Sequence, residues 1–79
     1  MRLVQILGTG CAKCEQLKKN VEQAIKTTGV EAMVEKVTDI NQIISFGVMM
    51  TPGLVIDGEV KAVGKVLSPE EISKLLQAA

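Results

Sequence analysis

The sequence lacks histidine, tyrosine and tryptophan, and Phe46 is its only aromatic residue. It also has no net charge, because nine basic residues balance nine acidic ones. Proteins that bind nucleic acids usually carry a basic surface, often with aromatic side chains that stack on bases. Neither feature is present, so the composition argues against a nucleic-acid partner.

Long hydrophobic runs are also missing. No segment approaches the roughly 20 apolar residues that a membrane-spanning helix needs. The apolar run at residues 3–7 is too short for a secretory signal, and no small-residue cleavage pattern follows it. We therefore expect a soluble cytoplasmic protein without a membrane partner.

The small size of the chain limits it to one core. A domain of this length buries about 60% of the surface that its unfolded chain exposes, and 47% of its residues are hydrophobic. We expect residues 1–79 to form a single monomeric domain. A structural zinc site is disfavoured because it needs four ligands, whereas the chain has two cysteines and no histidine.

The first half of the chain predicts a strand, a helix and a second strand. Residues 3–7 are typical of a strand buried on both faces, and a Gly-Thr-Gly sequence ends it. Residues 12–28 have one apolar face at helical spacing, and Gly29 ends this helix. Residues 30–37 are rich in branched side chains and predict the second strand. The apolar helix face consists of Cys14, Leu17, Val21, Ala24 and Ile25.

A short helix should follow the second strand. Asp39 is a suitable N-cap, and Gly47 is a suitable end. The residues expected on the buried side of this helix are Ile40, Ile43, Ile44 and Phe46.

The remaining residues predict a hairpin and a final helix. Asp57-Gly58 separates two apolar runs, and this pair favours a type I′ turn, in which both central residues need positive φ. Ser68, Pro69 and Glu71 supply an N-cap, a first-turn proline and a capping-box glutamate for a helix that continues through Leu76.

The resulting order is β-α-β-α-β-β-α, an α/β protein with a mixed four-stranded sheet and three helices. A right-handed crossover helix makes the first two strands parallel, and the hairpin adds antiparallel strands. The carboxyl end of the first strand is where open α/β sheets commonly place their ligand sites.

Cys11 and Cys14, the only two cysteines, lie at that end and are three positions apart. In a reducing compartment, such a pair is more often catalytic, redox-active or metal-binding than a permanent crosslink. Cys11 precedes the first helix, where unpaired N–H groups and the helix dipole favour a thiolate, and Lys13 adds a positive charge. Cys14 lies one turn further on the inner helix face, and we expect it to be less accessible than Cys11.

These motifs resemble the thioredoxin and glutaredoxin-like disulfide oxidoreductases, in particular their minimal thioredoxin-like members. The resemblance covers nearly the whole chain and implies a thioredoxin-like fold. It also implies that the Thr51–Pro52 peptide bond is cis and faces the disulfide. The residues that carry it are Cys11-Ala12-Lys13-Cys14 after a strand, residues 46–52 before the hairpin, Asp57-Gly58-Glu59-Val60 at its turn, and Gly64 in the last strand.

The resemblance implies a role for each site residue. Cys11 would attack a substrate disulfide and Cys14 would resolve the mixed disulfide, so the Cys11–Cys14 disulfide would be the redox group and no metal or organic cofactor would be needed. The backbone of Thr51 would pair with the substrate chain, and Met49 and Met50 would form an apolar rim. The implied partners are a protein or small molecule with a disulfide, and an upstream reductase or a low-molecular-weight thiol.

Several positions depart from the larger thioredoxins. Gln5 stands where those proteins have a buried aspartate that relays a proton to the resolving cysteine, while Lys36 matches their accompanying lysine. Ala12-Lys13 replaces their Gly-Pro. Without the acid, we expect water or the leaving group to take the proton of Cys14, which slows the resolving step.

Two other functions compete with disulfide exchange. Residues 8–14 and the helix after them are also similar to small heavy-metal-associated domains, in which two thiolates hold Cu(I). That family has the order β-α-β-β-α-β, and metal carriage leaves Thr51-Pro52 unexplained, so we favour redox exchange. A third possibility is an interaction module, which would have the same fold but little catalytic turnover in the cell.

Overall fold

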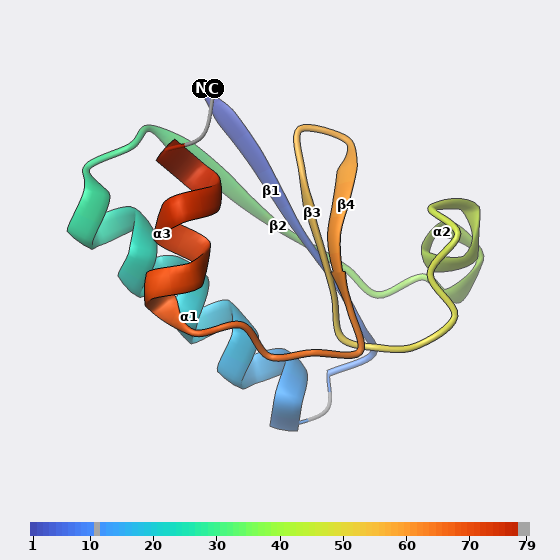
Figure 1. The fold of residues 1–79 in the computed structure, drawn as a ribbon. Helices are drawn as coiled ribbons and strands as arrows, with labels where there is room; N and C mark the ends of the chain where they lie inside the picture. Colours follow the sequence, from blue (N-terminus) through green and yellow to red (C-terminus); the bar gives the residue numbers. More distant parts are fainter. Residues whose placement is uncertain (11, 78–79) are drawn as a thin grey trace.

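The computed structural model describes residues 1–10 and 12–77. They form seven elements in the predicted order (Figure 1). The elements are β1 (Arg2–Leu7), α1 (Ala12–Thr28), β2 (Ala32–Val37), α2 (Ile40–Ser45), β3 (Gly53–Ile56), β4 (Glu59–Val63) and α3 (Pro69–Gln77). Within these described ranges, no helix combines the length and apolar character needed to cross a membrane.

The four strands form one mixed sheet in the order β2-β1-β3-β4. β1 and β2 are parallel and pair from Arg2 with Ala32 to Leu7 with Val37. β3 is antiparallel to both β1 and β4. The predicted α/β architecture, a mixed four-stranded sheet with three helices, is confirmed.

Helices cover both faces of the sheet. α1 and α3 lie together against one face, and α2 lies on the other side (Figure 1). β1 supplies both layers, because alternate side chains of a strand point to opposite faces. Val4 and Ile6 pack with α1 and α3, whereas Leu7 packs with Ile43 of α2. This arrangement accounts for the nearly continuous apolar sequence of β1.

The second strand begins later than the apolar pattern predicts. Residues 30–37 were expected, but β2 starts at Ala32. The two residues after α1 are used to end that helix: the Gly29 N–H donates to the Ile25 carbonyl, and the Val30 N–H donates to Thr28 Oγ1.

The expectation for the buried side of α2 was wrong for two residues. Asp39 caps the helix as predicted, accepting a hydrogen bond from the Asn41 N–H at 2.8 Å. Ile43 is buried, but Ile40 is 61% exposed and Ile44 is 53% exposed. Ile40 and Ile44 are four positions apart and form an exposed row beside the buried Ile43. A helix of six residues presents only one narrow strip to the sheet, so this second row remains outside the core.

The hairpin and the last helix have the predicted turn chemistry. Asp57 and Gly58 have φ values of 52° and 81°, as a type I′ turn requires. Ser68 Oγ accepts a hydrogen bond from the Glu71 N–H at 3.2 Å, which caps α3. Gly64, predicted within the last strand, instead follows β4, which ends at Val63. Its positive φ of 71° turns the chain out of the sheet.

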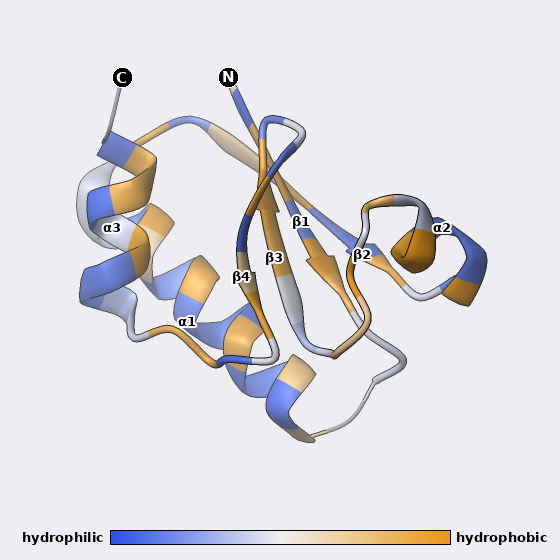
Figure 2. Ribbon diagram, turned by 45° about the vertical axis from the view of Figure 1, so that its right-hand side comes forward, coloured by the Kyte–Doolittle hydropathy of each residue, from blue (hydrophilic) through white to orange (hydrophobic). Residues whose placement is uncertain are grey.

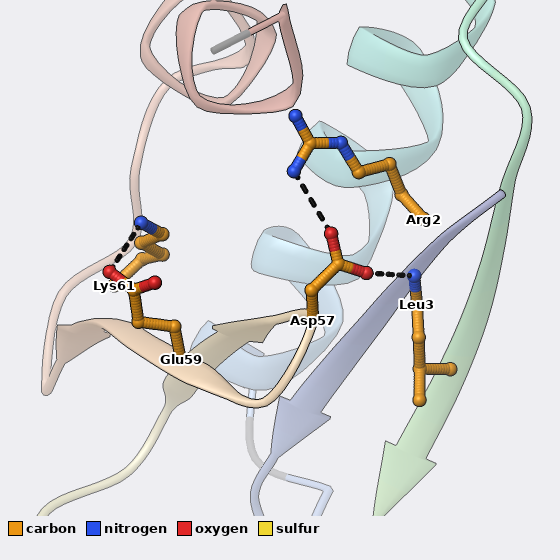
Figure 3. A network of polar contacts seen from close by, with 5 residues as sticks. All are labelled: Arg2, Leu3, Asp57, Glu59 and Lys61. Atoms are coloured by element: carbon orange, nitrogen blue, oxygen red, sulfur yellow. Dashed lines mark hydrogen bonds and ion pairs between the residues drawn. The ribbon is translucent and has the colours of Figure 1, made fainter. Parts of the chain in front are cut away.

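Asp57 also fastens the hairpin turn to the start of β1 (Figure 3). Its Oδ1 accepts the Leu3 N–H at 2.9 Å, and its Oδ2 forms an ion pair with Arg2 at 2.9 Å. The backbone hydrogen bond from Leu3 and the charge-assisted bond from Arg2 lower the pKa of the Asp57 carboxyl below its ordinary value.

The lowered pKa of Asp57 predicts a contribution to acid stability. A carboxyl with a lower pKa in the folded state stabilises fully above its unfolded pKa of about 3.8, and this contribution is lost as the pH falls through the folded pKa. Asp57→Ala should therefore lower the melting temperature at pH 7, and the difference from wild type should shrink between pH 5 and pH 3.

Asp57→Asn is the matched control, because asparagine tolerates positive φ and keeps an oxygen for the Leu3 N–H. It should lose less stability at pH 7 than Asp57→Ala. A difference between Asp57→Ala and wild type that stayed constant over this pH range would contradict the linkage.

Candidate active site

Cys14 lies in the first turn of α1, with its side chain turned inward as the helical spacing predicts. It is 1% exposed. Cys11, the predicted attacking thiol, lies outside the described residues. The end of β1 and the loop before β3 form the surroundings of Cys14.

Gly8 gives Cys14 its position against the sheet. It follows β1 and extends the pairing with β2, its N–H donating to the Val37 carbonyl at 2.9 Å. A β-carbon on residue 8 would overlap Cys14 Sγ and would lie 3.3 Å from Cys14 Cβ. The thiol therefore occupies the space that a side chain at position 8 would fill.

Thr51 adjoins the same point. A β-carbon added to Gly8 would lie 3.8 Å from Thr51 Cβ, so the loop before β3 comes close to Cys14. The Thr51–Pro52 peptide bond is cis, as the resemblance implied. Pro52 is fully buried, whereas Thr51 is exposed. The structure thus brings together Cys14, Thr51 and Pro52.

An apolar hollow of about 310 Å³ begins beside this point. Its lining includes Thr9 and Thr51 and the exposed row of α2, Ile40 and Ile44. Figure 2 shows the strongly hydrophobic positions of this short helix in orange. The complete lining is Thr9, Ile40, Ile43, Ile44, Val48, Met49 and Thr51. These residues are uncharged, so the hollow suits an apolar side chain.

The two methionines before Thr51 have different surroundings. Met49 is 85% exposed and lines the hollow. Met50 is 64% exposed and lies beside Gly64, where an added β-carbon would be 3.4 Å from Met50 Cβ. The Gly64 N–H donates to the Pro52 carbonyl at 2.8 Å, which ties this glycine to the loop. Neither methionine fills the core.

Lys13 and Lys36, the two lysines predicted to influence the cysteine pair, differ in their contacts. Lys13 is exposed on α1. Lys36 Nζ forms an ion pair with Glu15 Oε1 at 2.8 Å. The hydrogen bond to Glu15 and its charge raise the pKa of Lys36, and a smaller contribution in the same direction comes from Cys14. The hydrogen bond to Lys36 and its charge lower the pKa of Glu15.

Gln5, at the position of the family's buried acid, is directed away from Lys36. It shares a sheet face with Leu7, which packs on α2. Its Nε2 donates to Glu35 Oε1 at 3.1 Å. Lys36 shares the opposite face with Val34, which packs against the core of α1.

Sequence reasoning missed several residues of this site. Glu15 is adjacent to Cys14 in the sequence, but only the tertiary structure shows that it pairs with Lys36. The four-residue spacing of Ile40 and Ile44 was a usable signal for a separate apolar row on α2. Gly8 was treated as a strand terminator, although its missing side chain is what admits the Cys14 thiol.

No group of three or more histidine, cysteine, aspartate or glutamate residues within 1–10 and 12–77 is arranged to hold a metal ion. The described site instead consists of a buried thiol at the start of a helix and an adjacent cis-proline loop. On this fold, these features define the class of thioredoxin-like thiol–disulfide exchange proteins.

Comparison with known proteins assigns the family. The thioredoxin domain family matches residues 2–77, and the chain belongs to this family. A thioredoxin from Methanothermobacter thermautotrophicus is 47% identical over 76 residues, covering 96% of this chain and 99% of that protein. A thioredoxin from Methanocaldococcus jannaschii is 41% identical over 78 residues, covering 99% of this chain and 90% of that protein.

These relationships make the chain a thiol–disulfide oxidoreductase. They give no support to the alternative of a Cu(I) carrier.

The close approach of Gly8 and Cys14 predicts a coupled effect on stability. Gly8→Ala should lower the free energy of unfolding by about 1–3 kcal/mol, the usual cost of overpacking a filled site. In a Cys14→Ala background, which lacks Sγ, the same substitution should cost clearly less. Urea unfolding of the four proteins of this cycle measures the coupling. Equal costs in both backgrounds would show that the Cys14 sulfur does not limit the space at position 8.

Proposed function

We propose that the protein reduces disulfides of other proteins through a Cys11–Cys14 dithiol, without a metal or organic cofactor. The observation that carries this proposal is the burial of Cys14 beside the Thr51–Pro52 loop. A buried thiol is a poor partner for an incoming disulfide, whereas it can resolve a mixed disulfide formed on a cysteine three positions earlier in the chain. Cys11 is then the nucleophile, and Cys14 is the resolving thiol.

The exchange has two balanced steps. The Cys11 thiolate attacks one sulfur of the substrate disulfide, forming a mixed disulfide and releasing the other sulfur as a thiolate. The Cys14 thiolate attacks the Cys11 sulfur, forming the Cys11–Cys14 disulfide and releasing the second substrate thiolate. The substrate gains two electrons and, after protonation, two protons. An upstream reductase or a low-molecular-weight thiol then returns the protein to the dithiol.

The acidity of Cys11 is part of the proposal. Its place before α1 favours a thiolate, since the first N–H groups of a helix and the helix dipole stabilise an anion. Lys13, exposed two positions later, adds a positive charge. A cytoplasmic location suits this chemistry, because a reducing compartment keeps such a pair in its dithiol form.

Substrate binding would use the loop before β3 and the hollow beside it. The Thr51 backbone is available next to the cis-proline, and an extended peptide that pairs there gains main-chain hydrogen bonds. Met49 and Met50, which directly precede Thr51, are exposed and would supply adaptable apolar contacts to the substrate. We propose that an apolar side chain of the substrate, close to its reactive cysteine, enters the hollow lined by Ile40 and Ile44.

Cysteine variants test the proposed roles. In an insulin-reduction assay with dithiothreitol as electron donor, Cys11→Ser should lower activity at least about 100-fold, because it removes the attacking sulfur. Cys14→Ser should keep the first attack and accumulate a mixed disulfide with insulin, which non-reducing electrophoresis and mass spectrometry detect.

Cys14→Ala is the second trapping variant, because it places no hydroxyl in the buried site. If neither Cys14 variant trapped insulin while Cys11→Ser kept wild-type activity, the assignment of the two thiols would be wrong.

A charge placed in the hollow tests the substrate site. Ile44→Lys should raise KM for a protein disulfide about fivefold with little change in kcat, because the apolar contact of one half-exposed side chain contributes roughly 1 kcal/mol. The reaction with a small soluble disulfide, which does not reach the hollow, should be unchanged. Steady-state kinetics with both substrates provide the measurement.

Met33→Lys is the matched control. Met33 is also an exposed apolar residue, but it lies at the opposite end of the parallel strands. Equal effects of the two substitutions on KM would exclude a specific role for the hollow.

A further inference from the structure

The four methionines of the chain are all exposed. Met49 and Met1 have the largest exposed fractions, 85% and 83%, and Met50 and Met33 follow with 64% and 54%. Methionine commonly fills gaps in hydrophobic cores, because its unbranched side chain adapts to irregular space. Here all four side chains are accessible to small molecules in the solvent instead.

Two of these methionines lie at the proposed substrate site, and two lie away from it. Met49 and Met50 are in the loop that joins α2 to β3, directly before Thr51 (Figure 1). Met49 also lines the hollow, together with the exposed row of α2. Met33 is near the start of β2, at the opposite end of the parallel strands, and Met1 precedes β1. The chain therefore carries its own control positions for any chemistry of exposed methionines.

The surroundings of the two loop methionines distinguish Met49 from Met50. Met50 is folded over Gly64, where an added β-carbon would lie 3.4 Å from Met50 Cε and 3.7 Å from Met50 Sδ. One side of Met50 is thus in contact with the protein. Met49 is more exposed and lines the hollow itself, so a polar atom added to its side chain would lie at the rim of the substrate site.

Methionines are the main peroxide targets when the protein carries the proposed Cys11–Cys14 disulfide. The chain has no histidine, tyrosine or tryptophan, so its readily oxidised side chains are four methionines and two cysteines. In the disulfide, neither cysteine sulfur is a thiolate, and peroxide reacts with cysteine through the thiolate. The exposed thioethers then remain as the reactive groups.

We propose that Met49 is a site of reversible oxidation, and that its sulfoxide weakens the binding of protein disulfides without changing the thiol chemistry. This inference rests on the proposed function, in which the hollow takes an apolar side chain of the substrate. Oxidation converts the apolar thioether into a polar group that accepts hydrogen bonds. An apolar side chain entering the hollow would displace water from the sulfoxide oxygen and offer it no donor, which costs binding free energy.

The modification is a two-electron oxygen transfer from a peroxide. A lone pair of the Met49 sulfur attacks one peroxide oxygen, and the S–O bond forms as the O–O bond breaks. The proton of the transferred oxygen passes to the second oxygen, which leaves as water. Sulfur is oxidised by two electrons, and the peroxide is reduced by two. Reversal requires a methionine sulfoxide reductase, which uses two thiol electrons and two protons and releases the oxygen as water.

Kinetics before and after peroxide treatment test the inference. The protein is first converted to its disulfide, treated with hydrogen peroxide, desalted, and then reduced with dithiothreitol, which restores the thiols but leaves the sulfoxides. The KM for insulin should rise about fivefold, as expected for an unpaired polar group at a site close to solvent. The kcat and the reaction with a small soluble disulfide should be unchanged. Peptide mass spectrometry should find an added oxygen atom on Met49.

Leucine substitutions separate Met49 from the other methionines. Leucine is apolar and similar in volume to methionine, but it forms no sulfoxide. Each variant is compared with its own untreated sample, so that any effect of the substitution itself cancels. Peroxide should change the KM of Met49→Leu little, whereas Met33→Leu and Met50→Leu should show the same rise as wild type.

A polar residue at position 49 imitates the oxidised state. Met49→Gln should raise the KM for insulin without treatment, towards that of the oxidised wild type, and peroxide should not raise it further. Sulfoxide reductases specific for the two epimers at sulfur, added together to the oxidised wild type, should restore its original KM.

The results separate this inference from the proposed function. A peroxide effect of the same size in Met49→Leu and wild type would overturn the inference, as would a sulfoxide found on Met33 but not on Met49. An equal loss of activity with the small disulfide would place the damage at the cysteines and would also overturn it. Failure of the untreated wild type to reduce insulin would instead contradict the proposed function.

Discussion

The contact between Gly8 and Cys14 is the constraint on which the rest of the site depends. It joins the end of β1 to the first turn of α1, and the missing side chain at position 8 leaves the space that the sulfur occupies. Close packing at this point leaves the Cys14 side chain buried between β1 and α1. The cis-proline loop then meets the same point from the other side, through Thr51.

The two-sided burial of β1 places chemistry on both faces of the sheet. On the α1 face, alternation brings Lys36 to its ion pair with Glu15. On the α2 face, Leu7 and Val37 support a short helix whose outward row, Ile40 and Ile44, borders the apolar hollow. The thiol chemistry and the proposed substrate contacts therefore occupy neighbouring sites with separate structural supports, which is why single substitutions can test them independently.

Much of the fold follows from local patterns. The bounds of α1 were predicted correctly because its apolar spacing and Gly29 are strong signals. The Asp57-Gly58 turn was also predicted, because few residue pairs adopt positive φ at both positions. The burial of α2 was not: a six-residue helix with four nearby apolar residues does not reveal which of them the sheet will cover. The thioredoxin family relationship, expected from the two motifs, is confirmed over residues 2–77.

The sequence by itself determined the order of elements, the inward orientation of Cys14 and the chemical class of the protein, because periodicity, caps and turns act over a few residues. Only the tertiary structure decided the partner of Lys36, the exposure of Ile40 and Ile44, and the significance of Gly8. Each of these depends on which segments distant in the chain come to lie side by side. Glu15 and Lys36 are 21 positions apart, and their contact exists only because α1 crosses back over the parallel strands.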